Sequence, residues 1–82
     1  MIIEVTQDHI DRGNQGDCEY CPIAIAIRAT LKDYSISVGG TIFEYKNSYY
    51  KLPEKAMKFV QAFDNTLPVQ PFTFELTFES AD

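Results

Sequence analysis

The strict alternation of apolar and polar residues near the C-terminal end of the sequence constrains the fold more than any other feature. Threonine or glutamate separates successive apolar side chains, which are Phe72, Phe74, Leu76 and Phe78. Side chains of a strand point alternately to its two faces, so residues 72–79 predict a strand with one face buried and the other in water. At the edge of a sheet, such a strand would also provide the seam of a homodimer.

Short runs of β-branched and aromatic residues predict four more strands. Gly39 and Gly40 end one of these runs, and Asn47 and Ser48 provide the turn of a hairpin. The predicted strands comprise residues 2–6, 34–38, 41–46 and 49–52.

Helices are predicted between these strands. Thr6 is a suitable N-cap for one helical turn at residues 7–11, and after Pro53 the apolar residues recur with the spacing of a buried helix face. Residues 22–32 are ambiguous, because their isoleucines fit the period of a strand whereas Pro22 and three alanines favour a helix. We interpret this segment as a helix, and because it is apolar nearly all round, we expect it to be covered on more than one side.

The order of elements is therefore strand, helix, three strands, helix, strand. Two helices on one face of a mainly antiparallel sheet of four to five strands form an α+β sandwich of two layers. With 82 residues, the chain is long enough for one small domain over residues 1–82 and too short for two. No apolar run reaches the ~20 residues of a membrane-spanning helix. No signal-like segment precedes the first strand, so we expect a cytoplasmic protein without a membrane partner.

The net charge of −5 argues against nucleic acid as a partner, because lysine and arginine drive binding to phosphates. The basic residues are also scattered along the sequence. The acidic residues are concentrated in the first quarter, where Asp8, Asp11 and Asp17 form a candidate surface for binding a partner. The alternative is a solvated acidic face that aids solubility.

The predicted hairpin is a second candidate surface for binding a partner. Tyr45, Tyr49 and Tyr50 lie near its turn. Rigid amphipathic rings suit recognition at such a position. The alternative is ordinary packing at the edge of a sheet.

Cys18 and Cys21, together with His9, are the residues most suggestive of chemistry. Two cysteines separated by two residues can bind one zinc ion, and His9 would add a third ligand. Redox chemistry is a second interpretation, because Cys21 lies at a predicted helix start, where the helix dipole stabilises a thiolate. In the third interpretation, the cysteines are small apolar groups that close the loop onto the helix, and no cofactor is needed. The third is favoured, since a structural zinc site has four ligands and no second cysteine pair follows.

Other catalytic patterns are missing from the sequence. The glycines lack the lysine and the strand–loop–helix context of a phosphate-binding loop. A single histidine also limits the hydrolase triads that the chain could form. We therefore expect a protein that is not an enzyme.

Several different short motifs are distributed over most of the chain. They include His9-Ile10-x-x-Gly13, Asp17-Cys18-x-x-Cys21-Pro22-Ile23-Ala24-x-Ala26, Leu52-Pro53-Glu54-Lys55-Ala56 and Pro68-Val69-x-Pro71-Phe72-x-Phe74. Together they resemble a group of small uncharacterised proteins of bacteriophages and prophages. The resemblance implies a protein made in the cytoplasm of an infected bacterium, and it implies no particular activity.

These observations lead to one preferred function and one alternative. We expect a non-catalytic binding module that binds a host protein or a small signalling molecule. Inhibition of a host defence system is one role that such binding would serve. The alternative is a small zinc or thiol-redox protein that uses the cysteine pair.

Overall fold

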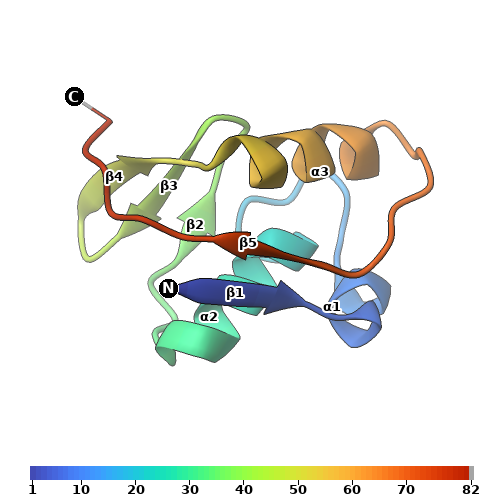
Figure 1. Ribbon diagram of the computed structural model, residues 1–82, viewed down its shortest axis with the longest axis horizontal. Helices are drawn as coiled ribbons and strands as arrows, with labels where there is room; N and C mark the ends of the chain where they lie inside the picture. The colour runs from blue at the N-terminus through green and yellow to red at the C-terminus, as the bar shows by residue number, and fades with distance from the viewer. Residues whose placement is uncertain (82) are drawn as a thin grey trace.

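The first and last strands of the chain pair with each other in the computed structural model, which describes residues 1–81. β1 (Ile2–Val5) and β5 (Phe72–Glu75) form a two-stranded antiparallel sheet in which Ile3 lies opposite Phe74 (Figure 1). Both of these side chains are buried, whereas the threonine and glutamate of β5 are exposed. The alternation therefore predicts the buried face correctly at Phe74 and Leu76, whereas Phe78, which it places on the same buried face, is 44% exposed.

The three middle strands form a separate antiparallel sheet, composed of β2 (Ser37–Val38), β3 (Ile42–Tyr45) and β4 (Ser48–Lys51). Tyr45 pairs with Ser48, so the hairpin turn contains Lys46 and Asn47, whose φ angles are +51° and +65°. Positive φ at both central positions belongs to a type I′ turn, which matches the twist of the strands. The hairpin forms as predicted, with its turn one residue earlier than expected.

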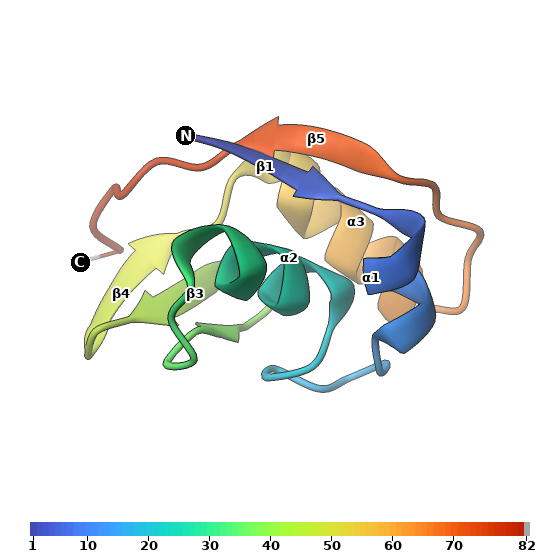
Figure 2. The same ribbon diagram turned by 90° about the horizontal axis from the view of Figure 1, so that it is seen from below.

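α2 (Pro22–Leu31) lies between the two sheets and contacts β1 of one and β2 of the other (Figure 2). Cys21 is its N-cap, and the Cys21 Sγ accepts a hydrogen bond from the N–H of Ala24. The helix ends at Leu31, and its C-cap, Lys32, adopts the left-handed conformation. Five of its residues are buried: Pro22, Ile23, Ala24, Ala26 and Ile27. The helical interpretation of residues 22–32 is confirmed, and so is the expected cover on more than one side.

Two further helices pack against α2. α1 (Gln7–Arg12) begins after Thr6, which is its N-cap as predicted. α3 (Glu54–Asp64) buries one face, on which Phe59 stacks with the ring of Phe72 from β5. The spacing of apolar residues after Pro53 therefore identifies the buried side of this helix correctly.

The fold class is α+β, as the order of elements predicts, but the strands form two sheets. The expectation of one sheet of four to five strands with two helices on one face is wrong. The physical reason is α2, which is apolar on most of its circumference and is stable only when both of its sides are covered. α2 therefore separates the β1–β5 pair from the β2–β4 sheet.

The C-terminal segment connects the two sheets (Figure 1). The strand predicted at residues 72–79 is shorter in the structure, because the chain leaves β1 after Leu76 and continues along β4. There Ser80 forms an antiparallel bridge with Tyr50. Phe78 packs against a cluster of rings from the hairpin: Phe43, Tyr45 and Tyr50.

The buried side chains form one continuous cluster with members from both sheets and from α2 and α3. Phe43 of β3 is its largest fully buried side chain. Burial of each large apolar side chain contributes roughly 1.5–3 kcal/mol to folding. Within residues 1–81, no helix combines the length and apolar character that crossing a membrane requires.

Candidate functional site

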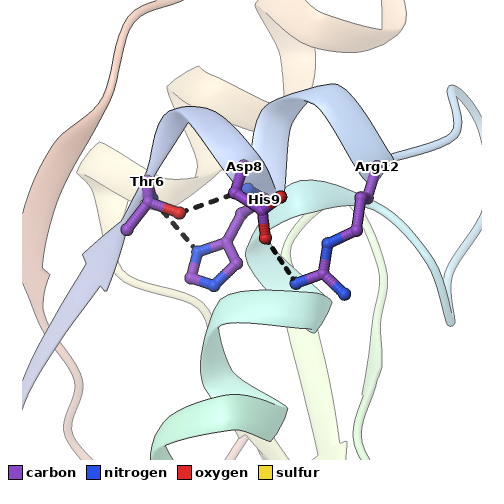
Figure 3. A network of polar contacts seen from close by, with 4 residues as sticks. All are labelled: Thr6, Asp8, His9 and Arg12. Atoms are coloured by element: carbon purple, nitrogen blue, oxygen red, sulfur yellow. Dashed lines mark hydrogen bonds and ion pairs between the residues drawn. The ribbon is translucent and has the colours of Figure 1, made fainter.

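His9 belongs to the N-terminal cap of α1 (Figure 3). Its backbone N–H donates to the Thr6 hydroxyl oxygen at 3.2 Å, and its Nδ1 accepts the Thr6 backbone N–H at 3.1 Å. This reciprocal arrangement is a capping box. One ring nitrogen of His9 is therefore committed to holding the start of α1.

The two cysteines lie in different environments, since Cys18 is exposed and Cys21 is buried, and both are free thiols. Burial raises the pKa of Cys21, and backbone hydrogen bonds from Ala24 and Ile23 only partly oppose it. A raised pKa disfavours the thiolate that metal binding and redox chemistry require. Among residues 1–81, no three His, Cys, Asp or Glu side chains form a group that could hold a metal ion. The structure therefore does not gather His9, Cys18 and Cys21 as the zinc hypothesis requires.

Of the three hairpin tyrosines proposed for partner binding, Tyr49 alone is exposed, at 52%. Tyr50 stacks on Phe43 with ring centroids 5.4 Å apart, and its edge meets Phe78. Tyr45 is partly buried and also contacts the ring of Phe78. Packing within the sheet therefore accounts for Tyr45 and Tyr50.

The acidic residues proposed for partner binding interact with their own local structure. Asp8 forms an ion pair with Arg12 at 2.9 Å. Asp11 accepts a hydrogen bond from a glutamine one turn earlier, and Asp17 accepts two from the backbone of its own loop. α1 and the hairpin turn lie at opposite ends of the molecule (Figures 1 and 2). Asp8 and Asp11 therefore do not share a surface with the hairpin tyrosines.

The strand proposed as a dimer seam, β5, has β1 as its strand neighbour on one edge. Lys55 of α3 donates a hydrogen bond to the backbone carbonyl of Thr73 in β5 at 2.9 Å. Lysine side chains at strand edges hinder pairing with further strands. The dimer seam stays a prediction, and this contact argues against it.

The structure gathers a different set of arginine and tyrosine side chains around one hollow of about 420 Å³. Its members come from α1, from α2 and from the segments on either side of α2. They include both arginines of the chain and two tyrosines whose exposed fractions are 52% and 88%. We call this hollow the arginine–tyrosine pocket, and its lining consists of Arg12, Tyr20, Ile25, Arg28, Ala29 and Tyr34.

Arg28 holds the two walls of this pocket together. Its Nη2 donates to the carbonyl of Glu19 at 2.6 Å and to the carbonyl of Ile36 at 3.2 Å. Its guanidinium carbon lies 5.5 Å from the ring centroid of Tyr20, a cation–π distance. Arg28 therefore connects the loop before α2 with the segment after it.

The charge of Arg28 has no carboxylate partner within residues 1–81. Both of its hydrogen bonds leave from one nitrogen, and its Nε is buried without a hydrogen-bond partner. The second arginine differs, because Arg12 pairs with Asp8 while both side chains stay mostly exposed (Figure 3). The pocket thus contains one uncompensated cation and one held in a weak surface pair.

Local turns position the two tyrosines of the pocket. The Asp17 carboxylate accepts the backbone N–H of Tyr20 at 3.1 Å and so fixes the loop before α2. After α2, the Asp33 carboxylate accepts both the N–H and the hydroxyl of Ser35, and these bonds lower the pKa of Asp33. This turn carries Tyr34 into solvent. The predicted strand at residues 34–38 is therefore reduced to β2, and Tyr34 lies outside it.

Sequence reasoning missed this pocket because its members are scattered along the chain. The basic residues form no dense run, and Tyr34 fits the pattern of a strand. One signal is nevertheless present: Arg28 is the single charged residue in the apolar segment of α2. A charge inside an otherwise buried helix needs a specific partner or marks a site.

A larger hollow of about 560 Å³ lies beside α3 and includes Met57 and Val60 in its lining. Its single basic residue, Lys58, pairs with Glu54 at 3.3 Å. The lining also contains no aromatic ring. This hollow therefore offers less to select a ligand than the arginine–tyrosine pocket does.

Comparisons of the chain with known protein families, with curated proteins and with solved structures gave no match. The function is therefore inferred from the site itself.

Proposed function

We propose that this protein is a non-catalytic binding module and that the arginine–tyrosine pocket is its recognition site. The observation that carries the proposal is the uncompensated guanidinium of Arg28, fixed beside two exposed tyrosines in one hollow. In keeping with the resemblance to small bacteriophage proteins, the partner would be a host protein or signalling molecule in the bacterial cytoplasm.

The residue types of the pocket support recognition. Tyrosine and arginine dominate the energetically important contacts of binding surfaces, because both present a large, rigid and partly apolar group. Tyr34 is 88% exposed, so a partner that covers its ring would remove apolar surface from water. These properties favour association with a partner.

The same lining gives little support for catalysis. It contains no carboxylate, histidine, cysteine or serine, which are the side chains that most often act as bases or nucleophiles. The carboxylate of Asp8 contacts the lining residue Arg12, and this ion pair occupies it. Retention of a partner without turnover is the function that fits these groups.

The proposal can be tested by retention of cellular components on the immobilised protein. Bacterial lysate is passed over the wild type, over Tyr34→Ala and over Tyr49→Ala, and bound proteins and small molecules are identified by mass spectrometry. Tyr49 is the matched control, because it is an exposed tyrosine outside the pocket. Neither ring is in the core, so both variants should fold.

We expect components that bind the wild type and Tyr49→Ala and are lost from Tyr34→Ala. Equal retention by the wild type and Tyr34→Ala would contradict the proposal. Selective loss with Tyr49→Ala would move the recognition site to the hairpin surface.

A further inference from the structure

We infer that the arginine–tyrosine pocket binds a small ligand that combines an aromatic ring with a phosphate group, the chemistry of a nucleoside monophosphate. This inference rests on the proposed function and specifies the ligand class of the same site. It depends on three properties of the pocket: its rings, its cations and its size.

The rings define the aromatic part of the ligand. Tyr20 and Tyr34 line the hollow together with the apolar side chains of Ile25 and Ala29. Stacking on tyrosine is available to any planar base, because every base has a π-face. The guanidinium of Arg28 lies over one face of the Tyr20 ring and holds it in place. The exposed ring of Tyr34 is therefore the main surface on which a flat ring can stack.

The cations define the anionic part. Arg28 has no ion-pair partner within residues 1–81, and the hydrogen bonds of its Nη2 leave the other terminal nitrogen for a ligand. Arg12 can exchange its exposed contact with Asp8 for a ligand anion at small cost. Once released, the planar guanidinium of Arg12 can donate two parallel hydrogen bonds to a phosphate, whereas Arg28 offers only the N–H groups of its remaining terminal nitrogen.

The size and the overall charge exclude a longer polyanion. A volume of about 420 Å³ lies within the range of ~300–1,000 Å³ typical of small-ligand pockets. Binding of a nucleic-acid strand depends on many basic contacts, whereas this chain has a net charge of −5 and places two arginines here. A single phosphate with an attached ring fits both facts.

The test is calorimetric titration of the full chain at low salt with the 5′-monophosphates of adenosine, guanosine, cytidine and uridine. Adenosine and ribose 5-phosphate are the matched probes that lack the phosphate or the base. Amide chemical shifts recorded during each titration locate the binding site. We expect at least one nucleotide to bind in the pocket, with the two partial probes roughly tenfold weaker or more.

Four variants are expected to change the affinity for the nucleotide differently: two weaken it, one strengthens it and one leaves it unchanged. Tyr34→Ala should weaken nucleotide binding roughly tenfold through lost stacking. Arg12→Gln should weaken it about fivefold or more through the lost charge. Asp8→Asn should strengthen it about twofold, because the Arg12 guanidinium is released from its partner. Tyr49→Ala should have no effect, since Tyr49 is outside the pocket.

Two kinds of result would overturn the inference. The first is the absence of chemical-shift changes at the pocket with all four nucleotides at millimolar concentration. The second is equal binding of a partial probe: ribose 5-phosphate would indicate a simple anion site, and adenosine would indicate stacking without phosphate recognition.

The lysate experiment separates failure of this inference from failure of the proposed function. If Tyr34→Ala loses a cellular partner while no nucleotide binds, the pocket recognises a different ligand class and the inference is wrong. If nucleotides bind but Tyr34→Ala retains every cellular component, the inference stands and the proposed function is wrong.

Discussion

Replacement of Arg28 by methionine tests the claim that one side chain holds the pocket walls together. Methionine keeps most of the unbranched stem and removes the guanidinium. The variant therefore loses the hydrogen bonds to the Glu19 and Ile36 carbonyls and the contact with the Tyr20 ring. These three contacts join segments on both sides of α2.

The expected loss of folding free energy in Arg28→Met follows from these contacts. A hydrogen bond from a charged donor contributes about 1.5–3 kcal/mol, and an exposed cation–π contact about 0.5–1 kcal/mol. The Glu19 carbonyl is at an exposed position, so water can replace its bond, whereas the bond to Ile36 is partly buried. Removing the buried Nε, which has no hydrogen-bond partner, stabilises the variant by about 1–3 kcal/mol and so offsets part of this loss. The net loss of stability should therefore be about 1 kcal/mol.

Urea denaturation measures this loss. For a chain of this size the m-value is about 1 kcal/mol/M, so the midpoint should fall by about 1 M. Arg12→Met is the control, because an exposed i,i+4 pair such as Arg12–Asp8 contributes only about 0.3–0.5 kcal/mol.

Hydrogen exchange supplies the local readout for the same variant. The amides of Asn14 and Cys21 are bonded within the loop before α2, so they should exchange faster in Arg28→Met. Amides between β1 and β5 should change only with global stability. A midpoint shift no larger than that of Arg12→Met would refute the role of Arg28 as a link between the walls.

Three further predictions concern the loop before α2. Gly13→Ala should destabilise the fold by about 1–3 kcal/mol in urea denaturation, since the new Cβ would lie 2.5 Å from the Pro22 ring, while Gly40→Ala, with open space around it, should be near neutral. Burial in the folded state raises the pKa of Cys21 above its ordinary value of 9.0, so the contribution of this thiol to stability should be intact below pH 9 and decline above it. Cys21→Ser should remove this decline. An identical pH profile of stability in the variant would contradict the raised pKa of Cys21. Native mass spectrometry of protein purified without chelator should give the mass of the chain alone; a zinc adduct whose removal unfolds the protein would restore the metal hypothesis.

Sequence patterns do not reveal the arginine–tyrosine pocket, because its side chains come from separate elements that are brought together by tertiary packing. Tyr34 follows α2 and fits a strand, but the Asp33 turn places it in solvent. Arg12 lies on α1 and Arg28 on α2, and only the packing of these helices brings them to one hollow. In contrast, the hairpin tyrosines are close together in sequence, but the rings of Tyr45 and Tyr50 pack against other rings of the same chain.

The sequence by itself determined the type of most local elements, because each depends on neighbouring residues. Alternation defined β5, Pro22 and the alanines defined α2, and Thr6 defined the start of α1. The arrangement of these elements is a different matter, since burial is shared among segments far apart in the chain. Only the tertiary structure decided that α2 divides the strands into two sheets and that its one arginine links two loops into a pocket. The physical reason is that an apolar helix must be covered on both sides, and the sequence does not specify which strands provide that cover.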